Sequence, residues 1–439
     1  MEDVLINHNA SVTYLPRHGA VVLDKSATKT KPTAPAVKAS GSGLIAPWGD
    51  DNLFPQNVLG KAEKTFLPSV IQWQVRAMGS RLIYGIEEID AATGEEKFRR
   101  VKDPVVEAWL KRTNIGRYCV ETASDLYWWG NMFPELILSN DRSEIVSISA
   151  QEAMYCRWEV QNQSTGLVDN CYINANWDNG GTEANSTVVK VIDPYYDPVG
   201  SLKARKEFKY IYPLSFPSPG KTYYQLVSWD SVRKNGWLEI AALIPTWKKA
   251  LMQNQVSIKY HIEIPEYYWS WKYKDWHKMS QAQQTNARST ELSEFNSFLT
   301  GEEKAGKSIM TTSKFDEGTN TKYPGWTITA LDDKIKDGKY IEDSQEASAH
   351  ILFAVGLDGT LIGSAPGKGF GAGSGSDKRV AFNMYMELQQ PNEDLILEPL
   401  HFIRDYNGWN PEYKFKFKRN QISTLDSGNE TKPINDGAL

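Results

Sequence analysis

The chain has 439 residues, more than one ordinary hydrophobic core supports, so we expect two or three domains. Its net charge is −5, which excludes a body that grips nucleic acid by neutralising phosphates over a broad surface. Aromatic residues make up 12%, with fifteen Trp, which favours broad sheet packing and a large oligomer.

Two classes of feature are missing from the sequence. Cys119, Cys156 and Cys171 lack the spacing of metal ligands and predict neither a disulfide framework nor a zinc site. No apolar run approaches the roughly 18 residues that span a bilayer, and the N-terminus has no signal-peptide core. We therefore expect a protein made in a cytosol, with no membrane segment.

The first part of the chain predicts an arm and a helix. Residues 1 to 43 end in TKTKPTAPAVKASGSG, which has too few apolar groups to fold alone, so we expect a flexible arm. PWGDDNLFP at 47–55 reads as a turn-rich aromatic segment. A helix is predicted from about Pro68, with Gly85 as its end.

The next part predicts a sheet packed with helices. A helix is expected over 116–129, ending at Gly130, and Phe133 to Leu138 has strand character. Short β-branched or aromatic runs then alternate with turns up to Tyr224, which predicts a largely antiparallel sheet and an α+β fold. The runs are EIVSIS, MYCRWEV, CYINANW, TVVKVID, KYIYPLSF and YYQLVSW.

A small inserted domain is predicted between two helical regions. Residues 237–260 read as two helices, with Pro245 in the first turn of the second, because a proline inside a helix breaks its hydrogen bonds. Residues 261–336 contain a polar helix at 281–299 and short strands near 308–312 and 326–330. A further helix is expected from Asp343 to Gly356.

Six glycines fall within the thirteen residues from Gly363 to Gly375, between two predicted helices. Such a stretch cannot pack a core, so it is either a mobile functional loop, carrying Lys368 and Phe370 outward, or a disordered surface loop. Downstream we expect a kinked helix over 377–404, interrupted at Pro391 and Pro399. The alternation from Tyr413 to Lys418 predicts a strand whose basic face either touches phosphate or is simply solvated.

One octapeptide, Gly301 to Ser308, matches the phosphate-binding pattern G-x-x-x-x-G-K-S, with Lys307 and Ser308 as the nucleotide-contacting residues. That loop works when a strand precedes it and a helix follows. Here a helical stretch precedes it and a strand-like stretch follows. We therefore expect a helix-to-strand turn, and keep a P-loop enzyme as the competing hypothesis.

No catalytic arrangement is apparent in the sequence. The six histidines are scattered, and His350 reads as a packed helix residue. The acid pairs lie in polar turn-like stretches, whereas acid–base catalysis needs buried carboxylates. We expect no catalytic residue, no metal and no cofactor, and hence not an enzyme.

In this order the segments resemble the portal proteins of tailed phages, of the short siphovirus-like or prophage type. The resemblance covers most of residues 44 to 420. It rests on loose patterns in combination: PWGDDNLFP, WWGNMFPELIL, IPTWKKALMQNQVSIKYHIEIPEYY, SQEASAHILFAVGLDGTLIG and GSGSDKRVAFNMYMELQQPNEDLILEPLHFI. The family often has proline where this chain has Leu357-Asp-Gly-Thr, which puts the local turn in doubt.

The resemblance implies a portal-type fold with an α/β wing, a two-helix stem, a small α/β clip, a kinked long wing helix and a short crown. The implied segments are an arm at 1–43, the wing at 44–235, stem helices at 236–260 and 337–356, the clip at 261–336, a tunnel loop at 357–376, the wing helix at 377–404, and the crown and tail at 405–439.

The resemblance also implies a function and partners. A dodecameric ring would sit at one capsid vertex of the virion, assembled in the cytoplasm of a bacterial host, and double-stranded DNA would be packaged and ejected through it. Partners would be the terminase large subunit, a head–tail connector, and major capsid or scaffold proteins; a generic oligomeric virion scaffold is the further alternative. DNA-facing residues would be Gly363, Lys368, Gly369, Phe370, Gly371, Lys378 and Arg379, and the clip interface would use Tyr267, Tyr268, Trp269 and Trp271.

Overall fold

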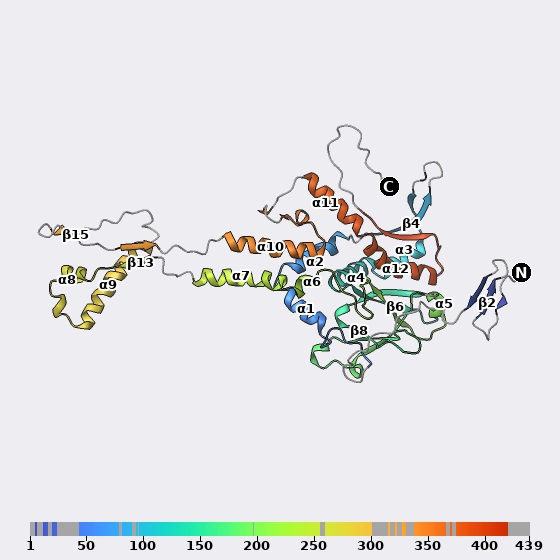
Figure 1. The fold of residues 1–439 in the computed structure, drawn as a ribbon. Coiled ribbons are helices and arrows are strands. Elements are labelled where there is room, and N and C mark those ends of the chain that lie inside the picture. Colours follow the sequence, from blue (N-terminus) through green and yellow to red (C-terminus); the bar gives the residue numbers. More distant parts are fainter. Residues whose placement is uncertain are drawn as a thin grey trace, which may run out of the picture. The chain divides into compact units, whose positions relative to one another are not determined.

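The computed structural model shows a mixed α+β chain that divides into two compact units. The first unit joins Met1–Pro245 to Ile341–Leu439, and the second is the insertion Thr246–Tyr340. Figure 1 shows the order of elements along the chain. The structure describes residues 5–6, 12–15, 20–23, 44–78, 81–89, 94, 96–195, 197–254, 260–300, 315–316, 321–322, 327–330, 338–365, 369–370 and 375–419.

The first unit is built on a seven-stranded sheet in the order β12-β6-β11-β10-β9-β8, with β7 also paired to β6. All of its pairs are antiparallel except β10 with β11, so the prediction of a largely antiparallel sheet is confirmed. The strands are β6 (Asn131–Leu138), β7 (Ile145–Gln151), β8 (Cys156–Trp158), β9 (Asn170–Ile173), β10 (Thr187–Val191), β11 (Lys209–Ile211) and β12 (Leu214–Ser215).

One predicted strand is wrong. YYQLVSW, residues 223–229, forms no strand. Its tyrosines fasten the segment to β8 and the residues after it, because the Tyr224 hydroxyl accepts from the Trp158 amide at 3.0 Å and the Tyr223 hydroxyl from the Gln161 amide at 2.9 Å. Side-chain hydroxyls thus make the contacts that a strand would make through its backbone.

Helices pack around this sheet. The predicted helix at 116–129 is confirmed as α4 (Ile115–Trp129), which ends at Gly130 with φ of 64°, the left-handed conformation that glycine adopts without strain. Other helices were not predicted: α1 (Phe54–Ala62), which begins at the end of the segment expected to be turns, α3 (Pro104–Arg112), α5 (Pro198–Lys203) and α6 (Asp230–Lys234). The helix predicted from Pro68 is α2 (Leu67–Ala77).

A second sheet of the first unit corrects the role of Gly85. The helix at Pro68 ends at Ala77, and β4 (Leu82–Ile89) runs straight through Gly85. A Cβ at Gly85 would lie 2.3 Å from the carbonyl oxygen of Arg99, so glycine allows close strand approach here and ends no helix. In this sheet β4 lies between β5 (Glu96–Arg100) and β19 (Tyr413–Phe417).

The strand predicted at 413–418 is confirmed as β19. Phe415 and Phe417 are buried, and Lys416 forms an ion pair with Glu87 on the neighbouring strand. The strand therefore has a buried aromatic face and a basic face that is solvated and locally paired, the commoner of the two expectations.

Part of the predicted N-terminal arm forms structure. β1 (Leu5–Ile6), β2 (Val12–Leu15) and β3 (Ala20–Leu23) make a three-stranded antiparallel sheet. The prediction depended on the polar stretch at the end of the arm and overlooked the short apolar and β-branched runs before it. Residues 24–43 lie outside the described part of the chain.

Two long helices link the units in sequence. α7 (Trp237–Asn254) is continuous and carries Pro245 in its interior, so the prediction of two separate helices is wrong. Pro245 is exposed, which lets water reach the carbonyl that loses its partner. α10 (Gly338–Val355) is followed by Gly356 with φ of 75°, as predicted. His350 is exposed on α10, and its ring stacks on Trp237 with centroids 4.1 Å apart, so its packing is limited to one face.

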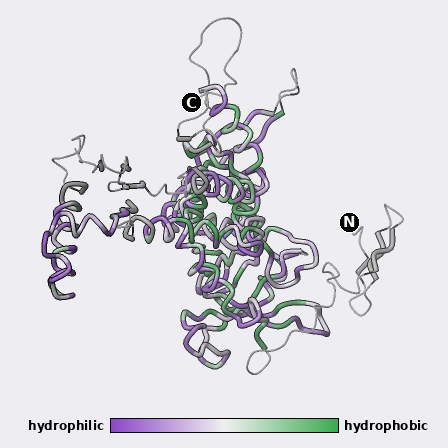
Figure 2. The backbone as a smooth tube through the Cα atoms, turned by 60° about the vertical axis from the view of Figure 1, so that its left-hand side comes forward, coloured by the Kyte–Doolittle hydropathy of each residue, from purple (hydrophilic) through white to green (hydrophobic). Residues whose placement is uncertain are grey.

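The predicted kinked helix near the C-terminus is two helices. Only Gln389 separates α11 (Gly375–Leu388) from α12 (Gln390–Tyr406), so the predicted interruption falls just before Pro391, which lies in the first turn of α12. The interruption predicted at Pro399 is wrong, because this proline lies inside α12. α12 is largely buried, with Ile396, Leu400 and Ile403 at or below 1% exposure. Figure 2 shows apolar stretches inside the first unit and hydrophilic ones on its outer helices and loops.

The second unit is smaller and more polar. β13 (Tyr260–Glu263) pairs with β16 (Thr327–Ala330), and β14 (Phe315–Asp316) pairs with β15 (Thr321–Lys322). α8 (Tyr267–Lys272) and α9 (Gln281–Thr300) provide its helices, which are mainly hydrophilic in Figure 2. The predicted helix at 281–299 and strand at 326–330 are confirmed; the strand expected at 308–312 lies outside the described residues.

Candidate functional site

The glycine-rich segment is ordered at both ends. A 3-10 helix over Gly359–Ile362 begins at Asp358, whose carboxylate accepts from the Thr360 amide at 2.8 Å. Gly363 ends it with φ of 78°. The chain then pairs β17 (Ser364–Ala365) with β18 (Gly369–Phe370), so Gly369 and Phe370 lie in a hairpin strand. Lys368 and Gly371 lie outside the described residues.

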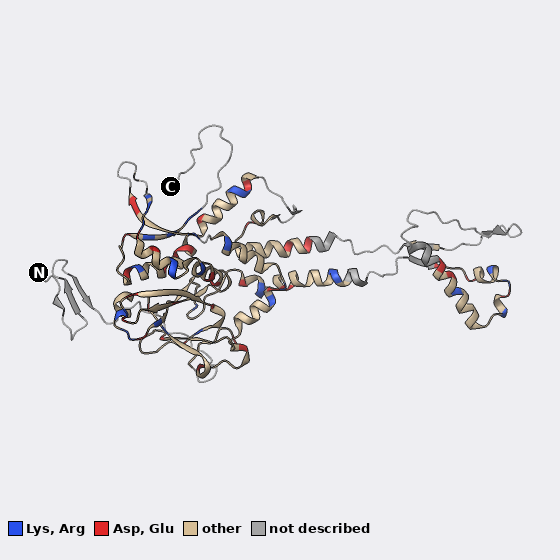
Figure 3. Cartoon of the chain, turned by 180° about the vertical axis from the view of Figure 1, so that it is seen from behind, with Lys and Arg blue, Asp and Glu red and all other residues tan. Residues whose placement is uncertain are grey.

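The two other predicted DNA-facing cations lie in the first turns of α11. Lys378 is exposed and Arg379 is half-buried. In Figure 3 basic residues appear near the start of this helix, identified by its place in Figure 1. The body of α11 is anchored by Tyr385, which meets Trp73 of α2 edge to face at 5.2 Å. Lys378 and Arg379 therefore lie at the N-terminal end of a helix whose C-terminal half packs against α2.

The junction between α11 and α12 is a buried polar joint. Gln389 accepts hydrogen bonds from the Tyr127 hydroxyl and from the Asn392 amide. Arg419, just after β19, donates to Gln390 at 2.6 Å and to Glu393 at 3.1 Å. Burial raises the pKa of Glu393, although Arg419 acts in the opposite direction. This joint sets the direction of α11, and with it the base of the glycine-rich segment.

The predicted clip aromatics have different environments. Trp269 is buried and stacks on Trp276 at 5.5 Å, and the Arg288 guanidinium lies 5.7 and 5.4 Å from the two ring centres. Trp269 is therefore part of the core of the second unit. Trp271 is 53% exposed, and Tyr267 and Tyr268 are half-buried, so these three have surface available for a partner.

The P-loop-like octapeptide follows α9, which runs to Thr300. A helix thus leads into the motif, whereas phosphate-binding loops follow a strand. Gly301 to Ser308, including Lys307 and Ser308, lie outside the described residues.

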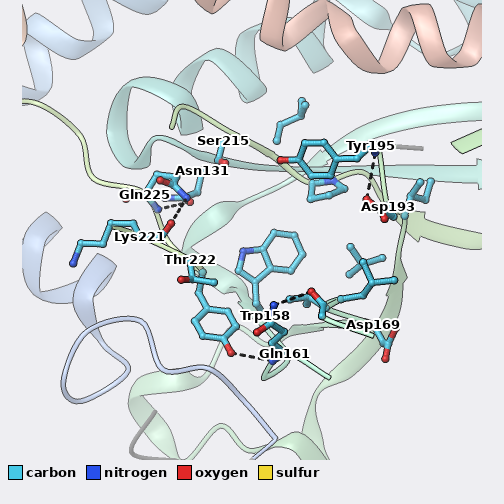
Figure 4. Close-up of a pocket in the computed structure, with 18 of the residues that line it drawn as sticks. Asn131, Trp158, Gln161, Asp169, Asp193, Tyr195, Ser215, Lys221, Thr222 and Gln225 are labelled. Carbon is cyan, nitrogen blue, oxygen red and sulfur yellow. Dashed lines mark hydrogen bonds between the residues drawn. The ribbon is translucent and has the colours of Figure 1, made fainter. Parts of the chain in front are cut away.

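Two cavities of the first unit were not predicted from the sequence. One, of about 310 Å³, lies over the sheet around Trp158, and Figure 4 shows it. The other, of about 580 Å³, is an apolar groove between α2, α10 and the 3-10 helix, lined by Phe66, Ser69, Val70, Trp73, Ser348, Leu352, Leu361 and Ile362. Their linings come from segments far apart in sequence, so no local pattern could reveal them.

In the described part of the chain, no group of three or more His, Cys, Asp or Glu side chains is placed to hold a metal ion. None of the helices described is both long and apolar enough to cross a membrane.

The fold belongs to a class seen in the neck of phage-like particles. A chain in the neck of an empty gene transfer agent (GTA) particle, computed with C6 symmetry, matches with a TM-score of 0.57 and 13% identity, over 87% of this chain and 88% of that chain. A chain of the native GTA virion gives the same values. A chain in the native neck computed with C12 symmetry gives 0.55 and 14% over the same shares.

At these identities the likeness concerns the fold, and it agrees with the portal-type resemblance of the sequence. No family model matches the chain, and no curated protein matches it.

Proposed function

We propose that this protein is a structural ring subunit of a phage-like virion, forming a conduit for double-stranded DNA at one capsid vertex. The observation that carries the proposal is the shared fold over 87% of the chain with proteins of GTA particle necks, one of them computed with C12 symmetry. A dodecamer is the ring size this supports.

The proposal assigns a role to each segment. Residues 44–235 and 377–404 form the wing, α7 and α10 the stem, 261–336 the clip, and 405–439 a short crown with the tail. The clip docks the terminase during packaging and a head–tail connector afterwards, with Trp271 as its exposed aromatic contact. The segment 357–376 lines the channel as a tunnel loop.

The charge of the chain suits a conduit. DNA that must slide needs weak, local contacts, and a net charge of −5 avoids the affinity that counterion release confers. Lys368, Lys378 and Arg379 then supply transient phosphate contacts from the loop and the start of α11. No catalytic group is required of the protein in this role.

Electron microscopy of the purified protein tests the proposal. Rings with an axial hole, with subunits related by rotation, are the expected result. Monomers that hydrolyse ATP, with activity lost in Lys307→Ala, would instead establish the P-loop enzyme. Closed assemblies without an axial hole would point to a generic scaffold and contradict the conduit.

A further inference from the structure

The outward face of α11 carries a row of apolar side chains. Val380, Met384 and Leu388 are 51, 63 and 71% exposed, and their spacing of four residues places them one above another along the helix. Tyr385 and Met386, on the packed side of the helix, are buried. Figures 1 and 3 show α11 at the periphery of the first unit. A surface helix normally exposes a polar face, so this apolar row indicates a surface that a further segment covers.

The described part of the chain ends beside this apolar row. Arg419, the last described residue, donates to Glu387 at 3.5 Å, to Gln390 at 2.6 Å and to Glu393 at 3.1 Å. Glu387 lies in the last turn of α11, three residues after Met384, and therefore at the edge of the row. The chain thus leaves the described structure at the C-terminal end of the row.

The sequence that follows has the composition and the length to cover the row. Residues 420–425 read NQISTL, with no charged side chain and with Ile422 and Leu425 as the apolar members. In an extended chain with three residues per turn, residues three apart share one side and lie about 9 Å from each other. Val380 and Leu388 are separated by about 12 Å along the helix axis. Six extended residues span about 19 Å, so the segment is long enough to follow the row.

Attachment to Arg419 favours this segment over a separate partner. A segment tethered through a few residues has an effective concentration on the order of millimolar at the row, whereas a separate protein must reach it by diffusion. Closing so short a loop also costs little chain entropy. The occupant that the connectivity favours is therefore the next stretch of the same chain.

We propose that residues 420–425 dock along the apolar row of α11 in the same chain, with Ile422 and Leu425 placed on the row. The docked segment holds α11 from its outward side, while Tyr385 and Trp73 hold it from the packed side. The helix that follows the glycine-rich segment is then fixed on both faces. The docking needs no ring, so it goes beyond the proposed conduit.

Oxidation of Met384 by hydrogen peroxide in the full chain tests the docking. The rate of oxidation follows the exposure of the sulfur, and mass spectrometry distinguishes Met384 from Met386. We expect Met384 to be oxidised about fivefold more slowly in the unmodified chain than in the double variant Ile422→Asp/Leu425→Asp, because charged side chains do not cover an apolar surface. Met386 is buried and should stay protected in both chains, which reports that α11 is still packed.

The double variant Ser423→Asp/Thr424→Asp is the matched control. It adds the same charge to the same segment, at positions outside the side that Ile422 and Leu425 share. Met384 should therefore be oxidised as slowly as in the unmodified chain.

Disulfide cross-linking of the full chain identifies the occupant directly. Met384→Cys combined with Ile422→Cys should form a bond within one chain under mild oxidation by copper phenanthroline. Val105→Cys, at a 65% exposed position on α3, replaces Met384→Cys in the control pair, which should form no such bond. The three native cysteines are buried and add little background.

Three outcomes would overturn the docking. The first is equal oxidation of Met384 in the unmodified chain and in Ile422→Asp/Leu425→Asp, and the second is equal acceleration by both double variants. The third is a bond between positions 384 and 422 of two different chains, which would assign the row to a second copy. Ring formation is scored separately, by the axial hole in electron micrographs, so the failure of one proposal leaves the other to be judged by its own measurement.

Discussion

At the scale of single residues, Arg157 holds the segment before α1 against the sheet of the first unit. Its side chain is fully buried, and its guanidinium donates to both the side chain and the carbonyl of Asn52, at 2.7 and 2.8 Å. It also lies 5.5 Å from the ring centre of Trp48 and 5.1 Å from that of Trp177. The cation ties the segment before α1 to β8.

Arg157→Ala should therefore destabilise the first unit by about 3 to 5 kcal/mol, because it opens a cavity and leaves buried acceptors without a donor. Thermal unfolding measures the loss, and proteolysis near Trp48 should accelerate. Arg99→Ala, which removes an exposed ion pair with Glu88, is the control and should cause a much smaller loss of stability, because solvent screens the pair. Equal effects of the two variants would contradict the role of Arg157.

His401 gives a prediction on pH. Burial, followed by the nearby charges of Arg404 and Lys414, lowers its pKa to about 4 from the ordinary 6.5, and its Nε2 accepts from the Phe415 amide at 3.2 Å. The unfolded chain takes up the proton first, so this residue lowers stability as pH falls from 6.5 towards 4. His401→Gln should show a smaller drop in melting temperature between about pH 8 and pH 5. If the melting temperature of His401→Gln fell as much as that of the unmodified protein, His401 would not be the residue responsible.

At the scale of elements, local signals account for what the sequence predicts well. α4 has a periodic apolar face and a left-handed glycine at its end, and β19 alternates strictly between aromatic and basic residues. The wrong predictions arise where tertiary contacts override local rules. Gly85 allows two strands to approach closely and does not end a helix, and Pro245 lies inside α7 and does not begin a second helix. The cavity around Trp158 could not be predicted, because distant strands and loops assemble it.

Pro245→Ala tests how much stability α7 loses by having a proline in its interior. Alanine restores the amide that can donate to the Ala241 carbonyl and should stabilise the helix by up to about 3 kcal/mol. Hydrogen exchange of the amides in 241–249 should slow, while exchange in α4 stays constant as an internal control. Faster exchange would mean that the proline is needed for the packing of the helix.

The cations in and just after the glycine-rich segment give a second prediction about an element. On the proposed function, reversing Lys368, Lys378 and Arg379 to Glu should reduce the DNA retained per assembled particle, roughly tenfold, because the three proposed phosphate contacts would become repulsive. Gel quantification of nuclease-protected DNA measures the effect. Lys414→Glu, at an exposed position on β19, is the matched control. If retention were unchanged in the triple variant, these residues would have no role in contacting DNA.

At the scale of the whole molecule, the two units differ in how they are held together. The main hydrophobic cluster of the first unit runs from Ala46 to Phe417, and the described residues of 246–340 add no buried member to it. In the described part of the second unit, the stacked pair Trp269 and Trp276 packs with Arg288. The hydrophobic core of the first unit is therefore complete without the described residues of the insertion.

Replacing residues 246–340 with a short Gly/Ser linker tests that division. The first unit should keep its near-ultraviolet circular dichroism and melt within a few degrees of the full chain, because its core loses no member. The full chain with Trp276→Ala is the matched comparison: it should loosen α8 and α9 in hydrogen exchange without shifting the main transition. A large fall in melting temperature on deletion would show that the units fold as one.

The same deletion also tests where the ring contacts lie. If the shortened chain still assembles into rings, the contacts that close the ring lie in the first unit, and the insertion is available to bind docking partners.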